Sequence, residues 1–366
     1  MRGAKYTLGV LCGLLVAGAA NHASAQIAPR LTGDAVIARL ETARQDLAAR
    51  AANVHDDRLA SASERLGQME AALRKSLGNK SSQPVAIIDD SSRVAVLRAD
   101  AAVQRTRAYL DAANGCPGAD AQAMAAGLAT TIDLLATASG SSKATPVVSG
   151  VETIDHRPLF ALHPGTTPMA VALVGTDLSD AQCADPQVTA TDEHGKPIDP
   201  QPVVTGVLPT RIELKLPGGA GLSSGAYVLH VVPKHKVFLR GCAAQPEAQA
   251  VLQVAPPLRV SVSYTLAATC NGQSVPAGSG ALPDITSYGG TASRQVDAAA
   301  CANPSRYAIS AKVAFGDGNS ASVGPFEQSA DADITVGLPA GLAMSWSPST
   351  HTVFVRSTPN ICKGVY

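Results

Sequence analysis

The periodicity of apolar residues changes once along the chain, near residue 140, and this change divides it into a helical part and a β part. Before that point, apolar residues recur with the a/d spacing of helices that pack along one seam. This stripe comprises Val36, Leu40, Ala43, Leu47 and Val54, and then Leu59, Ala62, Leu66, Met69 and Leu73. A further helix is predicted over residues 90–113, and an alanine-rich one over 119–138. Three or four amphipathic helices with short loops predict a small antiparallel bundle.

Beyond residue 140 the pattern becomes that of β-strands. Ile212, Leu214 and Leu216 alternate with charged residues, so that one face of this strand is expected to be buried and the other solvated. Turn residues separate similar strands at the spacing of a β-sandwich, and Ala-Pro-Pro at 255–257 precedes a second β region.

We therefore predict a multidomain α plus all-β fold, an N-terminal helical bundle followed by two immunoglobulin-like β-sandwich domains. The predicted ranges are 26–140 for the bundle, 141–150 for a flexible linker, 151–255 for the first sandwich and 256–366 for the second.

The N-terminus has the features of a secretory signal peptide. Arg2 and Lys5 precede a short apolar run, and Ala23-Ser24-Ala25 supplies the small residues of a cleavage site. The prediction is a signal peptide over residues 1–25, cleaved between Ala25 and Gln26. No later stretch is long and apolar enough for a transmembrane segment. We expect a periplasmic or secreted protein.

Six cysteines remain after this cleavage, an even number that predicts three disulfides in an exported chain. They are Cys116, Cys183, Cys242, Cys270, Cys301 and Cys362. Fifteen pairings are possible. We favour Cys183 with Cys242, and Cys270 with Cys301, because each pair falls within one predicted domain. Cys116 would then pair with Cys362.

The charge balance disfavours nucleic acid as a partner. Without Arg2 and Lys5 the chain has 27 basic residues against 29 acidic ones, and no region carries a large basic excess. Nucleic-acid binding usually needs a basic face that exchanges counterions with phosphate.

Three stretches of the first β region resemble the bacterial IPT/TIG immunoglobulin-like domain. They are HPGTTPMAVALVGTDL (163–178), LPTRIELKLPG (208–218) and LSSGAYVLHVV (222–232). They follow the family's Pro-Gly start, its Thr-x-Ile-x-Leu-x-Leu-Pro strand and its Gly-x-Tyr-x-Leu-x-Val strand. Leu178 stands where the family usually has an aromatic residue. The resemblance covers residues 151–255 and implies a structural or ligand-contacting module, with no catalytic residues to carry over.

Residues 221–225, Gly-Leu-Ser-Ser-Gly, fit the G-x-S-x-G pattern of a nucleophile elbow, with Ser223 as the nucleophile. An elbow requires a strand that turns sharply into a helix. Here a β-forming run follows at 226–232, so we interpret the motif as a turn between strands and predict that the chain is not an enzyme.

The remaining candidates are metal ligands and a basic patch. The pairs His156 and His163, and His230 and His235, lack the convergent spacing of a zinc site. The acidic and amide residues Asp317, Asn319, Asp331 and Asp333 lack the dense loop spacing of an EF-hand. We therefore predict no metal and no cofactor. The segment with Lys234, His235, Lys236 and Arg240 is a possible site for an anionic ligand.

These observations favour a non-enzymatic binding or scaffolding protein of the bacterial cell envelope or exterior. Its partner would be a protein or an envelope glycan, contacted through the immunoglobulin-like modules. Two alternatives remain open at this point. One is a periplasmic hydrolase with Ser223 as nucleophile. The other is a helical oligomerisation stalk that displays adhesin-like β domains.

Overall fold

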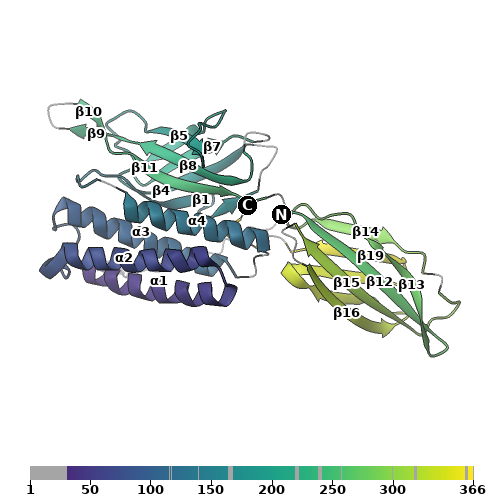
Figure 1. Ribbon diagram of the computed structural model, residues 1–366. Helices are drawn as coiled ribbons and strands as arrows, with labels where there is room; N and C mark the ends of the chain where they lie inside the picture. Colours follow the sequence, from purple (N-terminus) through teal and green to yellow (C-terminus); the bar gives the residue numbers. More distant parts are fainter. Residues whose placement is uncertain are drawn as a thin grey trace, which may run out of the picture. The chain divides into compact units, whose positions relative to one another are not determined.

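The computed structural model (Figure 1) describes most of the chain beyond residue 30. The described residues are 31–114, 116, 118–138, 140–163, 168–218, 222–237, 241–256, 258–298, 300–316, 320–358 and 362–365. The predicted signal peptide and its cleavage site lie outside them.

Four helices form the N-terminal part: α1 (Gly33–Val54), α2 (Asp57–Leu77), α3 (Asp90–Ala112) and α4 (Gly118–Thr137). Side-chain oxygens of Thr32, Asp56 and Asp89 accept backbone N–H groups at the starts of α1, α2 and α3, because these N–H groups have no partner within the helix. A short 3-10 turn, Gly78–Lys80, follows α2. In the described part of the chain, no helix has the length and apolar character needed to span a membrane.

The predicted apolar stripe is the seam between these helices. Leu40, Leu47, Leu59 and Leu66 are all completely buried. Helix α1 packs against α2 and α3, and α4 packs against α2 and α3 (Figure 1). Apart from Val54, which is 42 % exposed, the stripe is therefore covered within a single chain.

The first β region is an immunoglobulin-like sandwich of two sheets. One sheet has the order β2-β1-β4-β7-β6, formed by Pro158–Leu159, Val147–Thr153, Met169–Thr176, Arg211–Leu216 and Val203–Leu208. The other has the order β3-β11-β8-β5, formed by Ala161–Leu162, Ala248–Val254, Gly225–Val232 and Gln187–Asp192. A two-stranded hairpin, β9 (Lys234–Val237) with β10 (Gly241–Ala244), extends from the second sheet. Strand β1 begins at Val147, inside the range predicted to be a linker.

The second β region is also a sandwich of two antiparallel sheets. One has the order β13-β12-β15-β16, formed by Gln273–Ala281, Val260–Cys270, Arg306–Phe315 and Ser320–Ser329. The other has the order β14-β19-β18-β17, formed by Thr291–Gln295, Thr352–Ser357, Leu342–Ser347 and Ile334–Leu338. Trp346 is completely buried between them, and its ring meets that of Tyr307 edge-on at 5.4 Å between centroids.

Helices α3 and α4 pack directly against β1 and β11, so the helices and the first sandwich share apolar core residues. Arg105 of α3 is buried at this contact and donates hydrogen bonds to the carbonyl oxygens of Val151 (3.1 Å) and Leu159. Its guanidinium carbon lies 3.7 Å from the centre of the Phe160 ring. Gly127 allows α4 to approach the backbone of the first sandwich closely, since a Cβ at this position would lie 2.6 Å from the Phe160 carbonyl oxygen.

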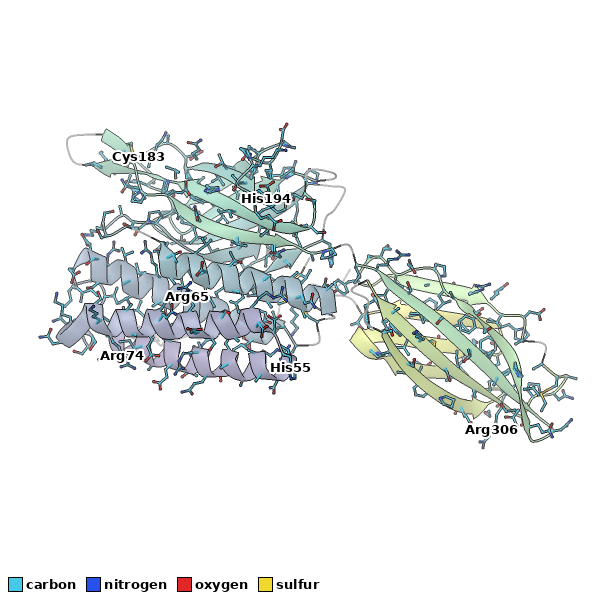
Figure 2. All side chains as sticks on the ribbon, in the orientation of Figure 1. His55, Arg65, Arg74, Cys183, His194 and Arg306 are labelled. Carbon is cyan, nitrogen blue, oxygen red and sulfur yellow. A yellow bond between two sulfur atoms is a disulfide. The ribbon has the colours of Figure 1, made fainter. Side chains whose placement is uncertain are left out.

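Three disulfides are present, with the pairing that the sequence analysis favours: Cys116–Cys362, Cys183–Cys242 and Cys270–Cys301. Cys183–Cys242 joins the hairpin β9–β10 to the loop after β4, and Figure 2 labels Cys183 there. Cys116–Cys362 joins the start of α4 to the C-terminal segment, whose Gly364 carbonyl accepts the N–H groups of Phe160 and Ala161. Three disulfides are typical of a protein that folds in an oxidising compartment.

We expect Arg105→Ala to lower the free energy of unfolding by about 2–5 kcal/mol, because it removes two buried hydrogen bonds and opens a cavity. Urea denaturation followed by circular dichroism would measure the change. The matched control is Arg306→Ala, since Arg306 (Figure 2) forms an exposed pair with Glu327 that is worth less than about 1 kcal/mol. An unchanged urea midpoint for Arg105→Ala would contradict the structural role of this contact.

Candidate functional site

The Ser223 hydroxyl lies 3.2 Å from the hydroxyl of Tyr227, and the two residues form a closed turn. The backbone N–H of Ser223 donates to the Tyr227 oxygen at 2.8 Å, and the Tyr227 hydroxyl donates to the Ser223 carbonyl at 3.0 Å. Tyr227 itself is buried in the sandwich core, whereas Ser223 is exposed. This arrangement is similar to the tyrosine corner of immunoglobulin-like folds, in which a tyrosine hydroxyl bonds to the backbone a few residues upstream.

Strand β8 begins at Gly225, directly after this turn. The backbone behind Ser223 is therefore extended and hydrogen-bonded to β5 and β11 on both sides. An elbow places the nucleophile at the start of a helix, beside an imidazole that accepts its proton. The described contacts of Ser223 provide a tyrosine hydroxyl in place of that imidazole.

The predicted basic patch lies on strand β9 and has mixed charge. Lys234 and Lys236 are exposed. The His235 Nε2 atom is 3.0 Å from the Asp177 carbonyl oxygen, and the Lys236 N–H donates to the Asp180 carboxylate. The backbone N–H groups of Lys236 and Gln182 lower the pKa of Asp180, which keeps it negative beside the lysines. Arg240 lies outside the described residues.

The candidate metal ligands are dispersed. His230 contacts Glu247 at 2.7 Å and Thr191 at 3.0 Å, whereas His156 lies beside Arg211. The side chain of Asp333 accepts a hydrogen bond from the Ser347 hydroxyl, and Asp317 and Asn319 lie outside the described residues. Within the ranges that the structure describes, no three His, Cys, Asp or Glu side chains gather as a metal site.

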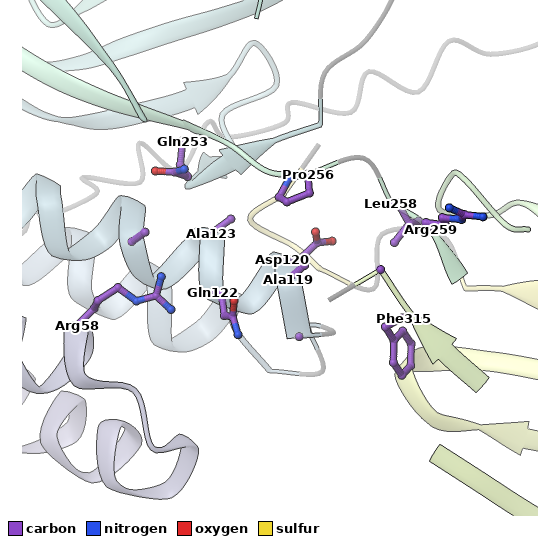
Figure 3. Close-up of a pocket in the computed structure, with 13 residues that line it drawn as sticks. Arg58, Ala119, Asp120, Gln122, Ala123, Gln253, Pro256, Leu258, Arg259 and Phe315 are labelled. Carbon is purple, nitrogen blue, oxygen red and sulfur yellow. The ribbon is translucent and has the colours of Figure 1, made fainter. Parts of the chain in front are cut away.

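A cavity of about 410 Å³ lies at the start of α4, where the chain passes from the first sandwich to the second. Figure 3 shows residues that line it. Leu258 and Phe315 form the apolar part of its lining, and Gln122 and Gln253 contribute amide groups. Two arginines also line it. Arg58 is paired with Asp56 at 2.9 Å and Arg259 with Asp284 at 2.6 Å, so both charges already have partners.

Three side chains meet beside this cavity, and we call Asp120, His163 and Tyr288 the junction triad. Asp120 belongs to the first turn of α4 and is only 2 % exposed. Its Oδ2 atom is 3.3 Å from the Nε2 atom of His163 and accepts a hydrogen bond from the Tyr288 hydroxyl. The Nδ1 atom of His163 is 2.9 Å from the Pro256 carbonyl oxygen.

The charge of Asp120 controls the protonation of this cluster. Burial lowers the pKa of His163, but the hydrogen bond and charge of Asp120 outweigh that effect and raise it overall. Burial, and then the charge of Asp120, raises the pKa of Tyr288, which keeps its hydroxyl proton in place as a donor. Sequence reasoning placed His163 among possible metal ligands and missed the other two residues, because the three are far apart in the chain.

An exposed apolar edge strand is the other feature that the sequence did not reveal. Strand β6 pairs with β7 on one side and forms the end of its sheet. Its residues Val203 and Leu208 are each 59 % exposed, and the strand contains no charged residue and no proline. Edge strands usually carry such residues, which prevent pairing with other chains.

No protein-family model matches this chain, and no curated protein sequence matches it. Among solved structures it is similar to the IG1 and IG2 domains of DIP-gamma, with 8 % identity, a TM-score of 0.22, and coverage of 48 % of this chain and 91 % of that one. It is also similar to a DUF4785 family protein from Legionella pneumophila, with 9 % identity, a TM-score of 0.25, and coverage of 58 % and 56 %. A three-Ig titin fragment has 11 % identity, a TM-score of 0.19, and coverage of 58 % and 86 %.

We expect Tyr227→Phe to lower the free energy of unfolding by about 1 kcal/mol, because the turn loses its bonds to the tyrosine hydroxyl. Chemical denaturation would measure it. The control is Ser223→Ala, which keeps both backbone bonds and should change stability by less than about 0.5 kcal/mol. A larger loss for Ser223→Ala than for Tyr227→Phe would mean that the serine hydroxyl has a further role.

Proposed function

We propose that this chain is an exported, non-enzymatic binding or scaffolding protein of the bacterial cell envelope or exterior. The first sandwich is of the IPT/TIG type in this proposal and begins with β1 at Val147, and the other domains span the ranges predicted above. Residues 1–25 direct export, and the mature protein is periplasmic or secreted. The three disulfides support this location, since such bonds persist in oxidising compartments.

The observation that carries the proposal is the edge of β6. An exposed edge strand offers a row of unpaired N–H and C=O groups to an extended peptide, which can add to the sheet as a further strand. Val203 and Leu208 add apolar contact area beside that row. The occupant we propose is therefore an extended segment of a protein partner, paired with β6, in preference to a glycan.

The outer edges of the four larger sheets support this choice by contrast. Pro276 and Pro325 interrupt β13 and β16, and Asp192 and Arg294 place charges on β5 and β14. Strands β2 and β3 are only two residues long. Strand β17 lacks charge, but its apolar side chains Ile334 and Leu338 are buried and Val336 is half-buried. Strand β6 combines a neutral backbone edge with exposed apolar side chains, the combination expected where a partner covers the strand.

The helices contribute to the scaffold in this proposal. An oligomerisation stalk would require an apolar stripe left for other chains, but all of the a/d stripe except Val54 packs against the chain's own helices. The bundle therefore stiffens the first sandwich.

Capture from envelope extract on immobilised mature protein tests the β6 proposal. We expect a specific protein to be retained by the wild type and lost with Leu208→Lys, because a lysine there adds charge and removes apolar contact. Ile87→Lys is the matched control, since Ile87 is 70 % exposed and lies on a helix connection. The captured protein is then purified and its binding measured directly. Equal binding by wild type and Leu208→Lys, or no retained protein, would contradict the proposal.

A fluorophosphonate probe tests the absence of serine-hydrolase activity. We expect no labelling of the mature protein, because the described contacts of the Ser223 hydroxyl offer a tyrosine and no base to accept its proton. Labelling of the Ser223→Ala variant gives the background level. Labelling of the wild type that disappears in Ser223→Ala would establish the hydrolase alternative.

A further inference from the structure

The junction triad lies where the second sandwich joins the rest of the chain. The chain leaves the first sandwich at Pro256, whose carbonyl oxygen contacts His163. It returns at Cys362, which is disulfide-bonded to Cys116, four residues before Asp120. The two connections of the second sandwich are thus both anchored beside the start of α4.

Tyr288 is the member of the triad that the second sandwich supplies. It belongs to the loop between β13 and β14 and packs against the apolar core of the helices. Buried Ser357 holds this loop, since its hydroxyl accepts the N–H of Gly289 and donates to the carbonyl oxygen of Ser287. A movement of Tyr288 is therefore coupled to the sandwich that carries it.

Both ring nitrogens of His163 face groups that only accept hydrogen bonds. Nδ1 faces the Pro256 carbonyl oxygen at 2.9 Å, and Nε2 faces the Asp120 carboxylate at 3.3 Å. A neutral imidazole has one N–H and can satisfy one of them, whereas the imidazolium ion donates to both. The geometry therefore selects the protonated form.

Asp120 depends on that proton. Its carboxylate is almost fully buried and accepts from His163 and Tyr288. When His163 becomes neutral, the carboxylate loses its partly buried cationic partner, and a buried charge without such a partner is unfavourable unless water reaches it. Withdrawal of Tyr288 would admit that water.

Other charged groups near the triad are already compensated. Arg58 of α2 and Arg259, just before β12, line the same cavity as Asp120. Asp56 pairs with Arg58, and Asp284 pairs with Arg259.

We propose that the junction triad is a latch that holds the second sandwich against α4 while His163 is protonated and releases it as the pH rises. The pKa of His163 is raised above its ordinary value of 6.5. The latch is therefore fully closed below that ordinary value and opens as the pH rises through the raised one.

Small-angle X-ray scattering of the full mature chain, with its disulfides intact, tests the latch between pH 6 and pH 9. We expect the radius of gyration of the wild type to increase with pH. That of Tyr288→Phe should be large at both pH 6 and pH 9, because phenylalanine keeps the apolar contact but cannot form a hydrogen bond to Asp120. His194→Gln is the control: His194 is exposed (Figure 2) and its loss should leave the response unchanged.

Nuclear magnetic resonance titration of His163 gives a second readout that does not depend on domain movement. We expect a midpoint above 6.5 in the wild type and a lower one in Asp120→Asn. A wild-type radius that stays constant while His163 titrates would overturn the latch. A His163 midpoint at or below 6.5 would also overturn it. Urea denaturation of each variant confirms that the compared proteins are folded.

Discussion

The buried guanidinium of Arg105 is the contact on which the arrangement of the helices and the first sandwich depends. A buried cation must be hydrogen-bonded, and the carbonyl oxygens of Val151 and Leu159 meet that need only when α3 sits at one position along β1 and β2. Phe160 packs under the guanidinium and meets Tyr109 edge-on at 5.7 Å. Apolar packing tolerates sliding, but these directional bonds do not, so Arg105 fixes the register of helix on sheet.

That register determines where the rest of the chain can attach. With α3 and α4 fixed on β1 and β11, the Phe160 backbone is presented to the C-terminal segment, which bonds to it through Gly364. The Cys116–Cys362 disulfide then closes a loop of 246 residues around both sandwiches. A cross-link over so long a loop restricts the unfolded chain strongly. The C-terminal segment is thereby joined to the start of α4, where the junction triad also lies.

The sequence predicted those features that depend on local periodicity. The a/d stripe located α1 and α2, and alternation located β7 and β8, because burial on one face leaves a repeating pattern. The sequence did not predict contacts between residues that are far apart along the chain. Arg105 has the pattern of a solvated helix position, and Asp120, His163 and Tyr288 share no local motif. The turn at Ser223 lies between these two cases. Tyr227 follows four residues downstream, at the start of a strand, and this spacing was an available signal for the hydrogen-bonded turn. The alanine-rich α4 was another, since a helix that is apolar on most sides is expected to be buried.

An Asp–His pair beside a cavity has the composition of a general base, so its chemistry decides how the triad is understood. A base needs an imidazole nitrogen with a free lone pair that can reach a substrate proton. In His163 both nitrogens point at acceptors, one of them a backbone carbonyl, and both are engaged when the ring is protonated. The tyrosine donates its proton to the same carboxylate, and its raised pKa opposes its loss. Each polar group in the triad thus uses its hydrogen-bonding capacity on another part of the chain. The groups of the triad are therefore engaged in a contact between domains, which favours a role in holding the junction over a role in proton transfer to a substrate.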